Sequence, residues 1–339
     1  MMNFSKNKIV TISFFSFFAL IIVAFREIKT TPMPVVVPQG WAKPTYDFQK
    51  NPPTKEGFEL GRHLFYDPIL SRDNTISCAS CHLQSSGFTH VDHDLSHGIE
   101  DKIGTRNSMT IMNVAWNKSF MWDGSVNHLD MQPLAPLYSA VEMDENLDNV
   151  VTKLNKSVKY KTLFYNTFED SLATGQRILL AFSQYLVHLN SYNSKYDKYI
   201  RNEAGGEFTE QEKNGLQLFR THCASCHSEP LFTNQNFEKN GLPIDTTLND
   251  LGRYAISKNL DDKLKFKVPT LRNIQYTFPY MHDGRFKKLR EVVNHYTTTQ
   301  QLQKTIVLSP NEKVDLVAFL LTLTDNEFLY DKRFGYPMQ

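Results

Sequence analysis

The four cysteines of this chain all lie in one pentapeptide that occurs twice. Cys78-Ala79-Ser80-Cys81-His82 returns unchanged as Cys223-Ala224-Ser225-Cys226-His227. Two thiols three positions apart, followed directly by an imidazole, attach a c-type haem: the sulfurs add to its vinyl groups and the histidine binds the iron. The alternatives, a thioredoxin-like redox pair or half of a zinc site, need no histidine directly after the second cysteine. We therefore predict two covalently bound haem c groups, held by Cys78, Cys81 and His82 and by Cys223, Cys226 and His227.

The N-terminus predicts export. Lys6 and Lys8 precede an apolar run from Ile9 to Phe25, which is the pattern of an export signal. Its length of about 17 residues lies between a long signal and a short membrane-spanning helix. Residues 1–28 are therefore either a signal peptide or a membrane anchor, and residues 29–50 read as a linker. We expect a periplasmic or otherwise exported protein, and no disulfides, because the haem motifs account for every cysteine.

The composition is that of an ordinary globular protein. Of 339 residues, 41% are hydrophobic and 22% are charged, and 37 basic against 36 acidic residues leave a net charge of +1. This is enough apolar material for two compact domains, and no long block of one charge indicates a nucleic-acid partner. We expect an N-terminal haem domain over residues 51–204 and a C-terminal haem domain over 205–339.

Helices are expected to deliver both motifs. Thr209 and Glu212 form a capping box, which predicts a helix from about Glu210 into the second motif. Residues 57–65 carry apolar side chains with helical spacing before the first motif, and Asp67-Pro68 ends that pattern.

Further along the chain, the apolar period predicts one long amphipathic helix from Ile178 through Tyr199. Ser309-Pro310 and Glu312 predict the start of a C-terminal core helix. Few stretches alternate with period two, so the fold should be mainly α, with long functional loops over 84–106 and 229–267.

The two motifs also anchor a wider repeat. Arg106-Asn107 and Met121–Gly124 follow the first motif, and Arg272-Asn273 and Met281–Gly284 follow the second. We therefore expect two cytochrome-c-like haem domains related by internal duplication.

With these landmarks in order, most of the chain after Gly57 resembles the bacterial di-haem cytochrome c peroxidases and the related methylamine-utilisation enzyme MauG. The segments that carry the resemblance are Leu60-Gly61-Arg62, Leu64–Asp67, Arg106-Asn107, Phe120–Gly124, Gln132, Val141–Met143, Val268–Asn273 and Pro279–Gly284. The resemblance implies that the N-terminal haem reacts with hydrogen peroxide, and that the C-terminal haem takes electrons from a small donor, a cytochrome c or a cupredoxin. It also allows for a homodimer.

Three residues match the family's reacting groups. Trp122 matches a tryptophan between the haems, and its alternative is simple packing of the domain interface. Gln132 and Glu142 match a distal glutamine and glutamate, and either alone would be read as a surface residue. Peroxide cleavage moves one proton from the oxygen on iron to the departing oxygen, which suits a carboxyl group that an amide assists.

Asn107, Thr277 and Pro279 match the positions through which the family holds a calcium ion between its domains. A side-chain amide and backbone carbonyls supply the oxygen ligands that calcium prefers. This expectation comes wholly from the resemblance.

The second axial ligand of the C-terminal haem departs from the peroxidase pattern. Tyr296 stands where the peroxidases have methionine, as in the MauG-like enzymes, and a phenolate ligand would lower the potential. Met281 and His295 are alternative ligands. Tyr296 also belongs to an apolar helix face with Leu289, Val292 and Val293, so a plain core position is the remaining alternative.

On the N-terminal haem, some relatives carry a sixth-ligand histidine in a mobile loop. His97 lies in the matching loop, near His90 and His93. We expect a solvated loop residue and an open, five-coordinate iron.

These features lead to one main hypothesis and two alternatives. The main hypothesis is an exported di-haem peroxidase that reduces hydrogen peroxide with electrons from a small redox protein. The first alternative is a MauG-like oxidase that uses high-valent haem on another substrate, which Tyr296 motivates. The second is a non-catalytic di-haem electron carrier, in which Gln132 and Glu142 would have no function.

Overall fold

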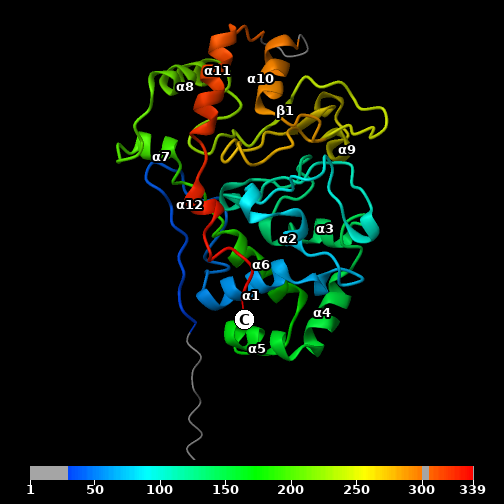
Figure 1. Ribbon diagram of the computed structural model, residues 1–339. Coiled ribbons are helices and arrows are strands. Elements are labelled where there is room, and N and C mark those ends of the chain that lie inside the picture. The colour runs from blue at the N-terminus through cyan, green and yellow to red at the C-terminus, as the bar shows by residue number, and fades with distance from the viewer. Residues whose placement is uncertain (1–29, 300–304, 339) are drawn as a thin grey trace, which may run out of the picture.

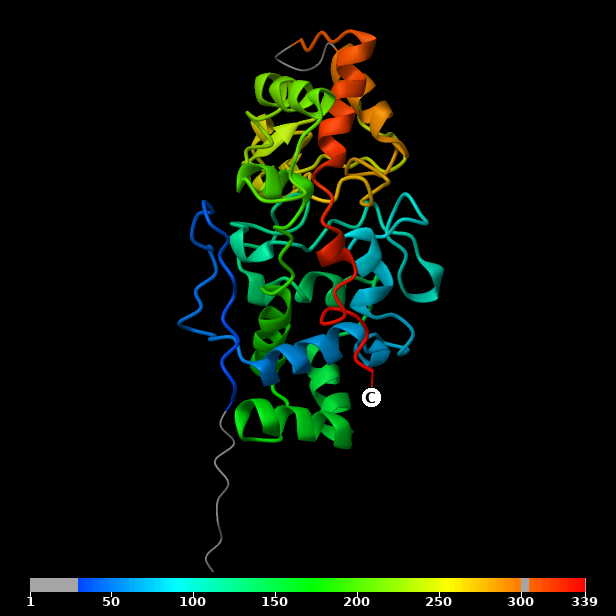
Figure 2. The same ribbon diagram turned by 60° about the vertical axis from the view of Figure 1, so that its left-hand side comes forward.

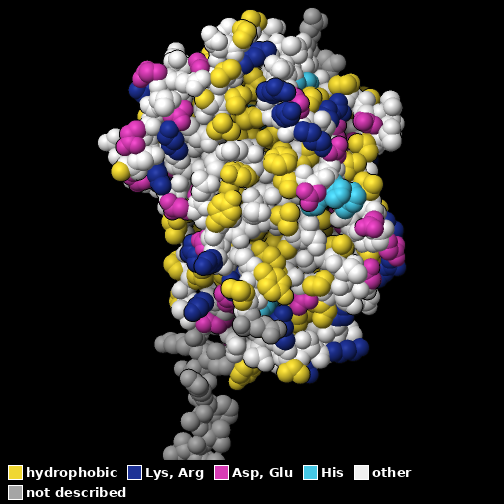
Figure 3. Space-filling model, in the orientation of Figure 1, with side chains coloured by type: hydrophobic (Ala, Val, Ile, Leu, Met, Phe, Trp, Pro, Cys, Tyr) yellow, Lys and Arg dark blue, Asp and Glu magenta, His cyan; other side chains and the backbone are white. Residues whose placement is uncertain are grey.

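The computed structural model describes residues 30–299 and 305–338, which form two stacked lobes (Figure 1). The expected signal or anchor over residues 1–28 lies outside the described residues. Among the residues described, no helix is long and apolar enough to cross a membrane. Basic and acidic side chains are interspersed over both lobes on the face shown in Figure 3.

The first lobe is built from six helices. They are α1 (Lys55–Tyr66), α2 (Cys78–Cys81), α3 (Leu134–Tyr138), α4 (Leu147–Lys156), α5 (Val158–Phe168) and α6 (Gly175–Leu186). Short 3-10 turns and long loops connect them, and the loops between α2 and α3 face the other lobe (Figure 1).

The described part of the second lobe, which omits residues 300–304, contains five helices and a small sheet. The helices are α7 (Lys195–Ile200), α8 (Glu210–His222), α9 (Tyr254–Ser257), α10 (Leu289–Thr298) and α11 (Pro310–Leu321). Strands β1 (Phe237–Lys239) and β2 (Lys265–Lys267) pair antiparallel, with Phe237 opposite Lys267. The expectation of a mainly helical fold with few strands is confirmed.

The helix starts expected from the sequence are confirmed. Thr209 and Glu212 close a capping box on α8: the Glu212 N–H donates to Thr209 Oγ1 over 3.2 Å, and the Thr209 N–H donates to Glu212 Oε2 over 2.7 Å. Ser309 and Glu312 do the same for α11. Each box satisfies donors that the first helical turn leaves without a partner.

Two helix pairs that cross at a glycine frame the two lobes. A Cβ atom added to Gly61 on α1 would lie 2.1 Å from the Ala181 carbonyl oxygen of α6, and one on Gly215 of α8 would lie 2.0 Å from the Asp315 carbonyl oxygen of α11. Because only a residue without Cβ permits this approach, glycine sets the distance between the helices of each pair.

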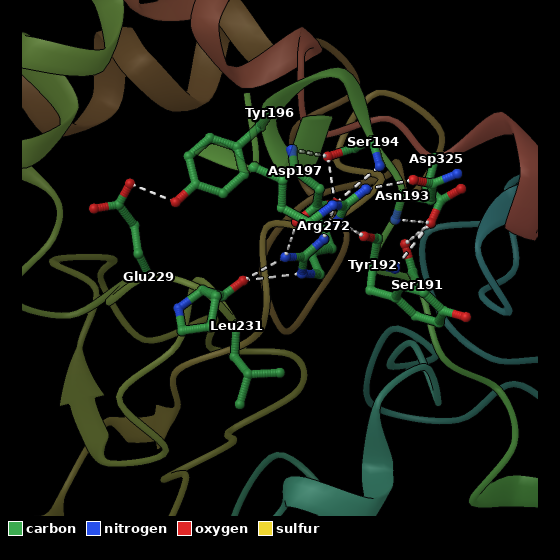
Figure 4. A network of polar contacts seen from close by, with 12 residues as sticks. Ser191, Tyr192, Asn193, Ser194, Tyr196, Asp197, Glu229, Leu231, Arg272 and Asp325 are labelled. Carbon is green, nitrogen blue, oxygen red and sulfur yellow. Dashed lines mark hydrogen bonds and ion pairs between the residues drawn. The ribbon is translucent and has the colours of Figure 1, made fainter. Parts of the chain in front are cut away.

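The expected single helix over 178–199 is wrong. Helix α6 ends at Leu186, and α7 begins only at Lys195. Between them Asp325 Oδ2 accepts the N–H groups of Tyr192 and Asn193, both over 2.9 Å (Figure 4). Those N–H groups are therefore not available to carbonyls one helical turn earlier.

The apolar period continues across this break because its side chains enter two different cores. Leu186 and Leu189 belong to the core of the first lobe, whereas Tyr196 packs in the core of the second. Tyr196 lies before the domain boundary expected at 204/205, and α7 thus packs with the second lobe. The spacing of apolar residues along the chain does not show whether they are buried in one hydrophobic core or in two.

The end of the chain returns to the first lobe. After α11 it passes through α12 (Asn326–Leu329) and runs down along the first lobe (Figures 1 and 2). Phe328 and Phe334 are buried in the first core. The hydroxyl groups of Tyr66 and Tyr185 both donate to the Phe334 carbonyl oxygen over 2.8 Å.

Replacement of Gly215 by alanine should destabilise the protein. Alanine favours a helix by about 1 kcal/mol over glycine, but its Cβ would overlap the α11 backbone, and such overpacking costs about 1–3 kcal/mol. Urea unfolding of the holoprotein, followed by circular dichroism, should show a net loss. Gly335→Ala is the control, since its nearest neighbouring atom would be 3.5 Å away. Equal midpoints for both variants would contradict this account of the crossing.

Candidate active site

Each motif histidine is held by the same kind of hydrogen bond, from its ring to a backbone carbonyl. His82 Nδ1 lies 2.8 Å from the carbonyl oxygen of Phe88, and His227 Nδ1 lies 3.0 Å from that of Phe232. A carbonyl only accepts, so Nδ1 carries the proton and Nε2 keeps the lone pair that binds a metal. Metal-binding histidines commonly have such a fixing partner. The residues of both motifs therefore fit a haem iron.

The loops that carry these two carbonyls share an unusual backbone conformation. Phe88 and Phe232 are fully buried and have positive φ angles of 59° and 55°. In each loop a threonine hydroxyl donates over 2.6 Å to the carbonyl just before the phenylalanine: Thr110 to Gly87, and Thr270 to Leu231. These carbonyls could not be predicted from residue types, because they belong to the backbone.

The loops after Thr110 and Thr270 correct the expected repeat. Asn113 and Asn273 share a positive φ, 57° and 56°, and both side chains donate to Ser191, over 3.1 Å to its carbonyl and 3.0 Å to its hydroxyl. The structural counterpart of Arg272-Asn273 is therefore Met112-Asn113. The expected match between Arg106-Asn107 and Arg272-Asn273 is wrong. It rested on the identical dipeptide alone, whereas Asn107 lacks the positive φ of Asn273.

The two segments Met121–Gly124 and Met281–Gly284 have similar backbone conformations. Met121 and Met281 have φ angles of 66° and 73°, and Gly124 and Gly284 have φ angles of 70° and 67°. Matching bridges, Phe120 to Val126 and Tyr280 to Phe286, close the two loops.

A cavity of about 360 Å³ opens beside the first motif. Cys78, Cys81 and His82 line it, and so do the three expected reacting residues, Trp122, Gln132 and Glu142. The structure thus gathers residues that are separated by up to 64 positions around one space.

Glu142 sits in the wall of this cavity, and burial raises the pKa of its carboxyl. Burial, together with the Glu142 charge, raises the pKa of the Cys81 thiol to about 11, so the carboxyl and the haem-attachment thiol are close. The Glu142 carbonyl accepts the Ile99 N–H over 2.8 Å. A Cβ on Gly98 would overlap the Glu142 backbone. The loop after the first motif therefore packs directly on Glu142.

Trp122 stands at the contact between the lobes. Its Nε1 donates to the Asn107 carbonyl over 2.8 Å, and the Asn107 N–H donates to the His282 carbonyl over 2.7 Å. The Trp122 carbonyl accepts the Lys267 N–H over 2.7 Å. The indole thus lines the cavity while its backbone and ring nitrogen are fastened to the interface.

Arg106 fastens the same loop to the second lobe. Its guanidinium contacts Asp123 over 2.7 Å and Asp250 over 2.6 Å. Because Asp123 follows Trp122 directly, this pair of contacts fixes the indole relative to both lobes.

Tyr296 and His295 have different surroundings on α10. Burial first, then the Cys226 and Cys223 thiols, raises the pKa of the Tyr296 hydroxyl, which places the phenol at the second motif. His295 Nε2 donates to the Asn240 carbonyl over 2.7 Å, and its Nδ1 lies 3.1 Å from Thr299 Oγ1. Both nitrogens of His295 are engaged, whereas Met281 is fixed mainly through its backbone carbonyl, which accepts from Asn107 over 3.3 Å.

The loop histidines form a stack. The rings of His90 and His93 lie 5.0 Å apart, and those of His93 and His97 lie 3.9 Å apart. His97 also lines the cavity, and its carbonyl accepts from Cys81 Sγ over 3.2 Å.

Two of the three residues expected at calcium meet at the interface. Asn107 Nδ2 lies 2.6 Å from the Pro279 carbonyl oxygen. Thr277 lies nearby in the chain and packs against Gly87. A cation between Asn107 and Pro279 would require the amide to turn so that its oxygen, rather than its nitrogen, faces the Pro279 carbonyl.

Sequence reasoning missed Lys267, which lines the cavity although it comes from the second lobe. It stands immediately before the Val268–Asn273 segment, and its burial distinguishes it from Lys265, the other lysine of β2.

Replacement of Tyr296 by phenylalanine should change the absorption and EPR spectra of the second haem while the first keeps its own. The reason is that the phenol is the side chain placed at the second motif. His295→Gln is the control and should leave both spectra unchanged, since its nitrogens are occupied elsewhere. An unaltered spectrum in Tyr296→Phe would remove tyrosine as a ligand.

Comparisons with known proteins agree with this geometry. A family model described as di-haem cytochrome c peroxidase matches residues 55–205. The methylamine utilization protein MauG of Methylophilus methylotrophus is 33% identical over 289 residues, covering 80% of this chain and 84% of that protein. The cytochrome c peroxidase Ccp of Escherichia coli is 34% identical over 296 residues, covering 84% of this chain and 62% of that protein.

Among solved structures, a MauG-like protein associated with microbial copper homeostasis aligns with a TM-score of 0.82 and 30% identity. The alignment covers 89% of this chain and 99% of that one. The relatives include both peroxidases and MauG proteins. The chain therefore belongs to the di-haem cytochrome c peroxidase and MauG family of oxidoreductases, whose members carry two haem c groups.

Proposed function

We propose that this protein is an exported peroxidase that reduces hydrogen peroxide to water with electrons from a small redox protein, a cytochrome c or a cupredoxin. The observation that carries the proposal is the convergence of Trp122, Gln132 and Glu142 on the cavity beside His82. The haem iron held by His82 supplies the site where peroxide binds and accepts electrons.

The cavity residues handle the protons and the orientation. Glu142 takes a proton from peroxide and returns it to the departing oxygen, and its raised pKa brings it closer to neutral pH than an exposed glutamate. The Gln132 amide orients the peroxide. Two electrons and two protons convert each peroxide to two waters, and Trp122 lies on the route between the two haem sites.

A MauG-like oxidase is the second candidate. Tyr296 favours it, because a phenolate ligand at the second motif would lower the potential of that haem and make it a poorer acceptor of single electrons. A non-catalytic carrier would leave the Gln132 and Glu142 side chains at the cavity without a function.

We also propose that the two lobes are haem domains related by internal duplication, over residues 51–204 and 205–339, with α7 packed on the second. The support is the recurrence of the glycine crossing, the histidine-fixing carbonyl and the paired asparagines in both lobes. Asn107, Thr277 and Pro279 are proposed to hold a calcium ion between them.

Steady-state assays test the main proposal. The purified holoprotein should consume hydrogen peroxide while oxidising a reduced cytochrome c or cupredoxin, with two donor molecules oxidised per peroxide. Failure with several donors, while the spectrum still responds to peroxide, would exclude the peroxidase and leave the oxidase.

Glu142→Gln should lower kcat/KM for peroxide by about 10²–10⁴-fold, the usual contribution of a general acid-base group. Glu100→Gln is the matched control: Glu100 is exposed and pairs with Arg72 and Lys102, so activity should stay unchanged. A fall of equal size in both variants would argue against a specific role of Glu142.

The pH profile should carry the signature of the same group. Only the carboxylate accepts a proton, so kcat/KM should fall as the pH drops through the raised pKa of Glu142, at a pH above its ordinary value of 4.5. Glu142→Gln should abolish this acid limb. An acid limb that persists in the variant would assign it to another group.

A further inference from the structure

Lys267 is a buried cation without an acidic partner. Its side chain is 4% exposed, and its Nζ donates to the Gln235 amide oxygen over 2.7 Å. Within the described ranges, none of the ion pairs includes Lys267. The other deeply buried cation, Arg272, shows the contrast, since both arms of its guanidinium contact the Asp197 carboxylate over 2.8 Å (Figure 4).

The surroundings of Lys267 oppose its charge. Burial alone lowers the pKa of its ammonium to about 8. A buried charge is ordinarily paired, because its lost hydration must be replaced. The Gln235 oxygen replaces one of three hydrogen bonds that the ammonium can donate. The position therefore fits an anion that the polypeptide does not provide.

The position of Lys267 indicates where that anion comes from. Lys267 lines the cavity of the first motif, and its backbone N–H is bonded to Trp122. Gln235 in turn donates to Asn117 Oδ1 over 2.9 Å, and Asn117 also lines the cavity. Arg106, the other cation of the wall, is already matched by two carboxylates.

Hydrogen peroxide is neutral, whereas a haem carries two propionate carboxylates. A haem attached at Cys78 and Cys81 has to occupy this cavity, because both cysteines line it. We propose that Lys267 binds a propionate of the haem held by His82, and that Gln235 positions its ammonium for that contact. The proposal rests on haem attachment and does not depend on peroxidase activity.

Charge neutralisation of a propionate favours the reduced iron, because reduction adds an electron near the cation. Loss of the ammonium should therefore lower the midpoint potential of the first haem. Lys267→Met in the holoprotein is the test, measured by spectroelectrochemical titration of both haems without peroxide. The expected result is a lower potential for the first haem and an unchanged potential for the second.

Lys265→Met is the matched control. Lys265 lies on the same strand β2 but pairs with Asp262 over 3.3 Å, so both potentials should remain at their original values. Lys267→Arg keeps the charge and should retain the original potential. Lys267→Gln removes only the charge and should reproduce the shift even if the methionine variant does not fold.

Resonance Raman spectra give a second readout, since the propionate-bending mode reports hydrogen bonding to that group. The mode of the first haem should shift in Lys267→Gln and stay in Lys265→Met. A potential and a bending mode that are both unchanged in Lys267→Gln would overturn the proposal. A shift confined to the second haem would overturn it as well, by assigning the lysine to the other propionates.

Discussion

His82 and His227 each donate the Nδ1–H to the carbonyl oxygen of a buried phenylalanine, and each site is built outward from this hydrogen bond. The carbonyl can face the imidazole only because Phe88 and Phe232 adopt positive φ angles. That backbone conformation is costly for a bulky residue. Full burial of the ring, and the threonine hydroxyl on the preceding carbonyl, hold it in place.

Hydrogen bonds also connect these two loops to the segment that joins α6 and α7. Asn113 and Asn273, three residues after the threonines, both donate to Ser191, which lies between α6 and α7. Asn273 Oδ1 also accepts the N–H of Asp325, whose carboxylate holds Ser191 and its two successors. Loops from both lobes are therefore connected by hydrogen bonds to one polar centre, which includes Ser191 and Asp325 (Figure 4).

Local chemistry was readable from the sequence, whereas long-range contacts were not. The capping boxes at Thr209 and Ser309 act within four residues, so pattern alone located α8 and α11. The break after Leu186 depends on Asp325, more than 130 positions away. The cavity residues Trp122, Gln132 and Glu142 were found only through a family resemblance. No sequence pattern singled out Lys267, because its role depends on its burial and on its position in the cavity wall.

The path of the last residues has a consequence for the order of events during synthesis. Phe328 and Phe334 complete the core of the first lobe, and Gln84, two positions after His82, donates to the carbonyls of Phe328 and Asp331. A chain made from its N-terminus therefore presents the first motif long before that lobe can close. The first lobe therefore cannot complete its core until residues 328–334 have been made and have packed beside Gln84.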